Sequence, residues 1–371
     1  MLRAGLYAHA TIITIMNIFF DARYIRTDFH DGISRYTTEL GNALAKLTPI
    51  TFIISDSAQL TFLPKKAKHV LIHHVTSVKE PFTAHILNKF QPDVVYSPMQ
   101  VIGSMGRNFK LIVTSHDMIY FHHKKAPYGQ PAIVRAGWRA YHATKLFERL
   151  ALNKADIVAT VSHAAQRQFQ EAKLTKRPII VIPNAPQALS HHAELQRAEG
   201  APRNLIYMGS FMPYKNIETL LKGMGYLPDY TLHILSKGPA ARKRELEALV
   251  PAKRNVVFHG GVSDGVYAQL LTDKAALVNA SLDEGFGLPV VEALSLGVPA
   301  VISDIPVFHE VAAGGALYFQ PLDPKDFADQ VKQLDSKAVR DRVISHSKTH
   351  AATFTWERSA RTLLNAITSL R

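Results

Sequence analysis

Ser281-Leu-Asp-Glu-Gly-Phe-Gly-Leu-Pro-Val-Val-Glu-Ala293 is the most informative segment of this chain. It places two carboxylates, Glu284 and Glu292, around a glycine-rich turn with seven residues between them. The two glycines let the backbone approach a ligand without a Cβ in the way, and Pro289 suits the first helical position. A helix that begins there directs its free amides and positive dipole end at the turn. Such a helix start favours a phosphate.

The alternative interpretation of this segment is a strand-turn-helix junction with glutamates on the surface. Its surroundings fit either interpretation. Gly297 is well placed to end the helix, and Val298-Pro-Ala-Val-Ile302 is the pattern of a following buried strand. The rest of the chain is therefore needed to decide between a ligand site and a plain junction.

Short β-prone runs alternate with helical stretches along the chain, as parallel α/β units require. The strands predicted for a first sheet are residues 17–22, 51–55, 92–96, 111–115, 157–161 and 179–182. Those predicted for a second sheet are residues 204–208, 231–235, 255–258, 276–279 and 298–302. Helices are predicted over residues 33–47, 132–153 and 356–370.

The length of 371 residues exceeds what one core usually holds, and a hydrophobic fraction of 47% is ample for two. We expect a first domain over residues 1–185, a linker over 186–203, a second domain over 204–354 and a final helix over 355–371. Met16 precedes the first strand directly, so residues 1–15 are interpreted as an extension. The uncharged run 4–20 contains polar residues and falls short of a membrane span, and it lacks a convincing cleavage site.

Cysteine is absent, so disulfides, thiolate chemistry and cysteine metal sites are excluded. Histidine pairs occur at 73–74, 122–123 and 191–192, but they lack helical i,i+4 spacing and carboxylate company. An Asp-x-Asp motif is missing as well. We therefore expect no metal site.

Positive charge is concentrated in the first half of the chain. Residues 1–185 carry 23 Lys+Arg against 11 Asp+Glu, whereas residues 186–371 carry 20 against 19. The segment 132–149 adds aromatic residues to its basic ones. Its simplest interpretation is a solvated helix packed by its apolar stripe. The alternative is a basic, aromatic face for an anionic partner such as a membrane surface. Nucleic acid is disfavoured because the basic residues are dispersed and no recognised module is present.

The two-glutamate segment resembles the signature of the retaining glycosyltransferases of family 4, whose GT-B fold sets two Rossmann-like, doubly wound domains face to face across a cleft. Further motifs resemble that family in the expected order, over about residues 17–360. They are Asp31-Gly-Ile-Ser-Arg-Tyr36, Thr114-Ser-His-Asp117, Thr160-Val-Ser162, Ile182-Pro-Asn184, Tyr207-Met-Gly-Ser210 with Lys215-Asn216, Ser303-Asp-Ile-Pro306 and Ala316-Leu-Tyr-Phe-Gln-Pro-Leu-Asp-Pro324. The order of the motifs carries more weight than any one of them.

The resemblance implies a nucleotide-sugar donor held by the second domain. A cation at Lys215 pairs with the diphosphate as negative charge develops. The acceptor-only carboxylate of Glu292 suits the ribose diol, and Glu284 lies near the transferred sugar. The remaining predicted donor contacts are Gly32, Ser210, Lys237, Gly285 and the amides of Phe286, Gly287 and Leu288.

The first domain is then expected to hold the acceptor. His116 ends an apolar strand, where a histidine is more often structural, but the matching family residue faces the reacting sugar. The candidate catalytic residues are thus His116, Glu284 and Lys215, and the candidate acceptor contacts are Arg35 and Asp117. The final helix is expected to pack back on the first domain.

The chain departs from the family pattern at the basic residues that bind the donor diphosphate. The family lysine usually works with an arginine, but the corresponding positions here are Ser210 and Tyr214. Lys237 or Arg242 are the candidates to supply the missing charge.

The predicted function is transfer of a hexose, with mannose favoured, from a nucleoside-diphosphate sugar such as GDP-mannose to a glycan or lipid-linked acceptor. No cofactor is implied, and a cytoplasmic enzyme at the inner face of the cell membrane is expected. Three alternatives stay open: another GT-B enzyme such as a sugar phosphate synthase, a nucleotide-sugar epimerase, and a catalytically inactive homologue. The retained lysine, glutamates and His-Asp pair disfavour the last of these.

Overall fold

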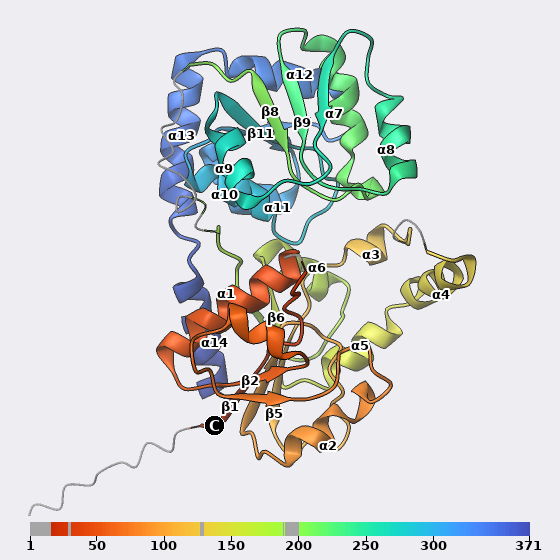
Figure 1. The fold of residues 1–371 in the computed structure, drawn as a ribbon, viewed down its shortest axis with the longest axis vertical. Helices are drawn as coiled ribbons and strands as arrows, with labels where there is room; N and C mark the ends of the chain where they lie inside the picture. The colour runs from red at the N-terminus through yellow and green to blue at the C-terminus, as the bar shows by residue number, and fades with distance from the viewer. Residues whose placement is uncertain (1–15, 29–30, 127–129, 188, 190–199) are drawn as a thin grey trace, which may run out of the picture.

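The computed structural model describes residues 16–28, 31–126, 130–187, 189 and 200–371. The predicted extension over residues 1–15 and most of the predicted linker lie outside these residues. The described chain forms two α/β halves, one around each of two sheets, joined by the linker region and by the C-terminal helices (Figure 1).

All strands of both sheets run parallel. The first sheet has the order β3-β2-β1-β4-β5-β6-β7 and the second the order β10-β9-β8-β11-β12-β13. The strands of the first sheet are β1 (Ile18–Asp21), β2 (Thr51–Ile54), β3 (His69–Leu71), β4 (Val94–Ser97), β5 (Lys110–Thr114), β6 (Ile157–Thr160) and β7 (Ile179–Val181). Those of the second are β8 (Asn204–Tyr207), β9 (Thr231–Ile234), β10 (Asn255–Phe258), β11 (Ala275–Asn279), β12 (Ala300–Ser303) and β13 (Ala316–Phe319).

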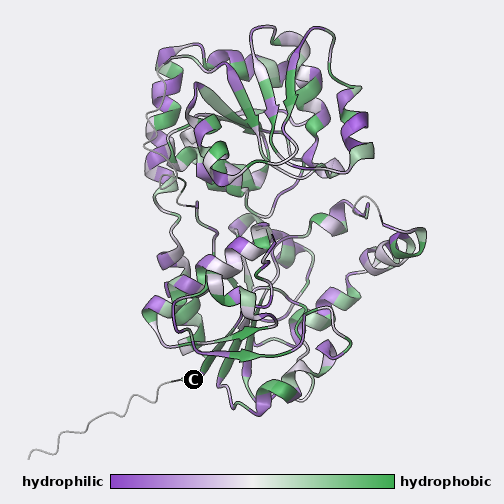
Figure 2. Cartoon of the chain, viewed as in Figure 1, coloured by the Kyte–Doolittle hydropathy of each residue, from purple (hydrophilic) through white to green (hydrophobic). Residues whose placement is uncertain are grey.

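Helices cover the faces of both sheets, and the apolar central strands are buried between them (Figure 2). In the first half they are α1 (Gly32–Leu47), α2 (Thr83–Asn88), α3 (Ile119–His122), α4 (Ala132–Ala143), α5 (Leu146–Asn153) and α6 (His163–Glu171). In the second half they are α7 (Ile217–Gly223), α8 (Ala240–Glu247), α9 (Asp264–Thr272), α10 (Leu288–Ser295), α11 (Pro306–Ala312), α12 (Pro324–Gln333) and α13 (Lys337–Ala351). The last helix is α14 (Trp356–Thr368).

The predicted strands are all present, each shifted by no more than two residues. The prediction of one helix over residues 132–153 is wrong, because Thr144 is extended (φ −121°, ψ 151°) and separates α4 from α5. A single straight helix would turn the buried His142 and the buried Glu148 to different sides of its axis. The break lets both side chains face the body of the protein.

The final helix α14 returns to the first half and lies along α1 (Figure 1). The indole of Trp356 packs against the ring of Tyr36 with 5.9 Å between ring centroids. The Ser359 hydroxyl donates to the carbonyl of Pro183 at 2.6 Å. These contacts hold the C-terminal helix against the helices that cover the first sheet. The two halves are therefore connected by two chain segments, the linker region and the segment that leads into α14.

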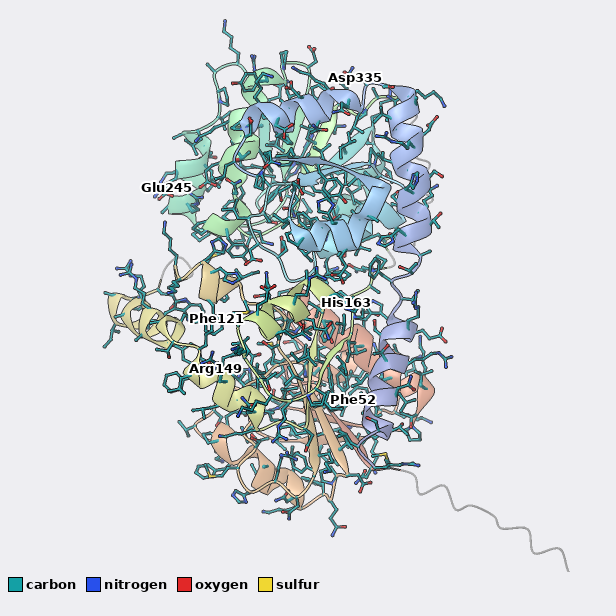
Figure 3. All side chains as sticks on the ribbon, turned by 180° about the vertical axis from the view of Figure 1, so that it is seen from behind. Phe52, Phe121, Arg149, His163, Glu245 and Asp335 are labelled. Carbon is teal, nitrogen blue, oxygen red and sulfur yellow. The ribbon has the colours of Figure 1, made fainter. Side chains whose placement is uncertain are left out.

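A non-covalent contact also joins α11 to the start of α6 across the boundary between the halves, where Figure 3 shows His163. The Glu310 carboxylate accepts hydrogen bonds from the backbone amides of His163 and Ala164, both at 2.8 Å. A carboxylate at a helix N-terminus satisfies free amides and the helix dipole together. Glu310 therefore helps to hold the two halves in register.

Replacing Glu310 by alanine is expected to lower the free energy of unfolding by about 1–2 kcal/mol, the usual value of a helix-capping contact. Thermal unfolding should then show a decrease in Tm of about 2–4 °C per kcal/mol. Asp329→Ala is the matched control, because Asp329 makes only an exposed i,i+4 ion pair with Lys325. Equal Tm values for Glu310→Ala and the wild type would contradict this role.

Candidate active site

The two-glutamate segment forms the loop between β11 and α10 and the first turns of α10, at the carboxyl edge of the second sheet. Gly287 precedes α10 with φ +97°, a left-handed conformation that L side chains rarely adopt. A Cβ there would also lie 2.7 Å from the Phe308 ring. The Phe286 side chain is buried against Phe354, which leaves the backbone of this turn for a ligand. Glycine is therefore required for the loop to enter the helix in this way.

Glu284 and Lys215 form an ion pair at the centre of the site. Lys215 Nζ lies 2.5 Å from Glu284 Oε1, which also accepts a hydrogen bond from the Ser281 hydroxyl at 2.8 Å. Both charged side chains are largely buried, with 15% of the lysine and 9% of the glutamate side chain exposed. The pair places a poorly solvated cation and anion next to the start of α10.

The backbone around Lys215 explains why it reaches Glu284. Asn216, in a left-handed conformation (φ +51°), donates its side-chain amide to the carbonyls of Ala280 and Pro321. The amide of Leu282 donates to the carbonyl of Tyr214 at 2.7 Å. The turn after β8 is thus tied to the loop after β11, its neighbour in the sheet. Lys215 is held in position by main-chain contacts on both sides.

Glu292 is buried in α10 and lines a cavity of about 140 Å³ at the boundary between the halves. Burial raises its pKa to about 7, against the favourable charge of Arg35. Arg35 forms an ion pair with Asp264 of the second half at 2.8 Å, and Gln187 donates to the other oxygen of Asp264 at 2.9 Å. The predicted acceptor residue Arg35 thus lies beside the predicted donor residue Glu292.

The raised pKa of Glu292 makes stability depend on pH. The folded protein keeps this proton up to about pH 7, whereas an ordinary glutamate loses it near 4.5. The contribution of Glu292 to the free energy of unfolding therefore decreases as pH rises from about 4.5 to 7, and it stays at the lower value above pH 7. We expect Glu292→Gln to raise Tm by at least about 3 °C at about pH 8 and to leave it nearly unchanged at about pH 4. A Tm difference independent of pH would contradict the burial of an ionisable Glu292.

His116 and Asp117 follow β5 and meet the glycine turn from the first half. A Cβ added to Gly285 would lie 3.1 Å from both Asp117 Oδ2 and the carbonyl oxygen of His116. The Ser162 hydroxyl, at the end of β6, donates to the carbonyl of Gly285 at 2.8 Å. The strand ends of the first sheet therefore face the two-glutamate loop of the second at close range.

The side chains of this His-Asp pair are poorly solvated. Burial lowers the pKa of His116 and raises that of Asp117 to about 6. His116 Nε2 lies 2.9 Å from the carbonyl of Pro98, and because a carbonyl only accepts, Nε2 carries the hydrogen. With a lowered pKa the imidazole is neutral near pH 7, so Nδ1 is a hydrogen-bond acceptor.

The remaining predicted donor residues are placed less closely together. Gly32 begins α1, and a Cβ there would lie 3.8 Å from Leu288 at the start of α10. Ser210 is exposed, and its carbonyl accepts from the Tyr207 hydroxyl at 2.9 Å. Lys237 is exposed and forms no ion pair with any residue that the structure describes. Arg242, by contrast, is buried and paired with Glu218 and Glu245, so Lys237 is the better candidate for the missing positive charge.

A larger cavity of about 610 Å³ opens on the other side of Glu284, between the halves. His122 Nδ1 lies 2.7 Å from Asp283 Oδ2 across it. Asp283, Ser281 and Glu310 were not among the predicted site residues, because nothing in the local pattern separates them from ordinary surface residues. Other side chains that line the cavity are Met118, His123, Lys145, Arg167 and Pro306.

Metal-binding clusters and membrane-spanning helices are both absent from the part of the chain that the structure describes. The described residues hold no group of three or more His, Asp or Glu side chains placed to bind a metal ion. Within the same residues, every helix is too short or too polar to cross a bilayer.

Two parallel α/β halves that meet at strand ends, with a lysine and two glutamates around a helix start, define the GT-B class of nucleotide-sugar enzymes. Residues 30–185 match Glycosyltransferase Family 4, and residues 202–336 match Glycosyl transferases group 1. The O-antigen chain mannosyltransferase RfbU of Salmonella typhimurium is 36% identical over 82% of this chain and 87% of its own. The chain therefore belongs to the family 4 glycosyltransferases, and it is a glycosyltransferase.

Solved structures agree on the fold. Sucrose-phosphate synthase from Thermosynechococcus elongatus superposes with a TM-score of 0.71 at 18% identity, covering 96% of this chain and 99% of that one. HepE from Anabaena, in complex with UDP and glucose, superposes with a TM-score of 0.70 at 17% identity, covering 95% and 100%. At such identities the likeness concerns the GT-B fold alone, which confirms the predicted architecture.

Proposed function

We propose that this protein is a retaining, metal-independent mannosyltransferase that builds a cell-surface polysaccharide or glycolipid. Its donor is a nucleoside-diphosphate sugar, with GDP-mannose favoured, and its acceptor is a hydroxyl of a glycan or lipid-linked glycan. The buried Lys215–Glu284 pair beside the start of α10 is the observation that carries the proposal. The similarity to RfbU, which is named as an O-antigen mannosyltransferase, supports the choice of sugar and pathway.

The donor diphosphate is placed against the start of α10. The backbone amides of Phe286, Gly287 and Leu288 and the positive end of the helix supply donors for its oxygens. Lys215 exchanges its contact with Glu284 for one with the diphosphate. Glu284, released from the lysine, accepts hydrogen bonds from hydroxyls of the transferred sugar.

We place the nucleoside of the donor at the smaller cavity, which Glu292 lines. Glu292 accepts hydrogen bonds from the ribose hydroxyls, which favour its ionised form and offset the cost of burying it. Arg35, Asp264 and Gln187 form a polar wall of the same cavity. Lys237, at the end of β9, adds positive charge near the phosphates.

The chemical step follows the pattern that the family implies. The bond from the anomeric carbon to the phosphate oxygen breaks, and the acceptor oxygen forms a new bond to the same face of that carbon. The acceptor proton passes to the leaving phosphate, so no protein nucleophile is needed. Lys215 stabilises charge on the phosphate, and Glu284 and the neutral His116 interact with the sugar as positive charge develops.

The acceptor is placed against the first half of the chain, where Asp117 faces the glycine turn and Arg35 lies nearby. The excess of positive charge in residues 1–185 favours an anionic acceptor or an anionic membrane surface. We place the enzyme in the cytoplasm, at the inner face of the cell membrane.

Thermal unfolding with added nucleotides tests the donor assignment. GDP or GDP-mannose, without added metal, is expected to raise Tm more than UDP or ADP, because a ligand at about 100 times its Kd adds about 2.7 kcal/mol of stability. Glu292→Ala should weaken GDP binding at least about tenfold by removing the ribose contact. A rise in Tm with UDP alone would mean that the donor carries uridine diphosphate and not guanosine diphosphate. No response to any nucleotide would contradict the donor site.

A further inference from the structure

Helix α4 exposes its apolar face to solvent. Ile133 is 81% exposed, Val134 44% and Tyr141 37%. With Gly137, these residues stand at positions i, i+1, i+4 and i+8, which share one side of a helix. Figure 1 shows α4 standing out from the first half of the chain. The simplest interpretation of the sequence, a helix packed by its apolar stripe, is therefore wrong.

A neighbouring side of α4, which carries Trp138 and His142, makes its contacts with the protein. Trp138 packs edge-on against Tyr120, with 4.8 Å between ring centroids, and lies 4.3 Å from the His142 ring. His142 also contacts Phe121. These aromatic contacts hold α4 on α3 in an orientation that turns the apolar stripe outward.

Helix α5 continues the same exposed surface. Leu146, Phe147 and Leu150 are each more than half exposed. Phe147 stacks on Tyr141 of α4 with 5.4 Å between centroids and 9° between planes. The two stripes are thus joined across the break at Thr144. We call the exposed apolar residues of these helices, together with the basic residues among them, the α4–α5 surface.

The charge around this surface has one sign. Residues 119–153 hold six Lys and Arg but a single carboxylate, Glu148. Glu148 is buried and accepts a hydrogen bond from the Ser115 hydroxyl at 3.0 Å. None of the six cations forms an ion pair with a residue in the described ranges. They are Lys124, Lys125, Arg135, Arg139, Lys145 and Arg149, the last labelled on α5 in Figure 3.

We propose that the α4–α5 surface docks on an anionic lipid bilayer. The apolar stripe enters the boundary between head groups and acyl chains, and the basic residues meet the anionic head groups. A second copy of the chain fits less well, because pairing two such surfaces would bring two sets of unpaired cations together. The proposal names the membrane contact within the proposed function, but it depends on α4 and α5 and not on the donor site.

Docking in this way would bring the larger cavity close to the membrane. Lys145, between α4 and α5, lines that cavity together with Glu284. A lipid-linked acceptor could then present its glycan to the cavity while its lipid stays in the bilayer. The basic, apolar surface and the cavity are adjacent parts of one face.

Vesicle flotation with the full-length protein tests the proposal. Wild-type protein should float with vesicles of phosphatidylglycerol and phosphatidylethanolamine and not with phosphatidylcholine alone. Arg135→Glu with Arg139→Glu should lower the bound fraction at least about tenfold. Ile133→Asn with Leu150→Asn should lower it similarly, by removing apolar insertion. Lys222→Glu with Arg244→Glu, an equal charge change on α7 and α8, is the control and should bind as the wild type does.

Two further readouts separate the possible outcomes. GDP should shift Tm equally in all these variants. Equal shifts would show that the variants fold and that the substitutions leave the donor site intact. Equal vesicle binding by the α4–α5 variants and the control would overturn the proposal. So would gel filtration that shows a dimer dissociated by Ile133→Asn with Leu150→Asn while vesicle binding is unchanged, because the surface would then join two subunits.

Discussion

Replacing Lys215 by methionine is expected to lower turnover about 100- to 1,000-fold, the effect of removing one preorganised electrostatic contact to a developing charge. Lys215 is largely buried, and its ammonium group lies 2.5 Å from Glu284. Methionine keeps most of the side-chain volume but removes the charge. The variant should therefore bind a nucleoside diphosphate more weakly and stabilise the leaving diphosphate less well.

Initial rates with GDP-mannose and a glycan acceptor measure the first effect, and calorimetric titration with GDP measures the second. Lys222→Met is the matched control, because Lys222 is an exposed lysine on α7, away from the two-glutamate loop. It should change neither quantity by more than about twofold. Turnover of Lys215→Met within about tenfold of the wild type would remove Lys215 from the phosphate site.

Replacing Glu284 by glutamine is expected to lower turnover about 100-fold and to leave GDP binding as strong as in the wild type, or stronger. Glutamine keeps the shape of the side chain and loses its negative charge. The sugar then lacks an anionic partner in the transition state. Lys215, freed from its carboxylate partner, is more available to the diphosphate.

The same two assays apply to Glu284→Gln, with Glu247→Gln on α8 as control, since Glu247 makes an i,i+4 pair near the surface. The two site variants should thus agree in turnover and differ in the direction of their effect on GDP affinity. A parallel loss of GDP affinity and turnover in Glu284→Gln would mean that Glu284 acts by supporting the fold of the donor site. The ion pair would then be structural.

The strands were predictable because each is a short apolar run between turn residues, a local pattern. Two edge strands, β3 and β13, escaped prediction. In β3, His69 and Leu71 are exposed and leave no such pattern, and Ala316–Phe319 was identified only as part of a family motif. The break between α4 and α5 escaped for another reason. Helical periodicity continues through Thr144, and only the packing of Trp138 and His142 on α3 decides which side of α4 faces inward.

Sequence by itself determined the glycine turn, the start of α10, the lysine and glutamate that follow strand ends and the second glutamate in α10, since these follow from local conformational preference and spacing. Tertiary structure alone decided their partners. Lys215 meets Glu284 across 69 residues, and Arg35 meets Asp264 across 229. Such pairs form only when strand ends of one sheet, or of two facing sheets, are brought together by packing. The outward turn of the apolar side of α4 was decided in the same way, because periodicity defines a helix face but not what covers it.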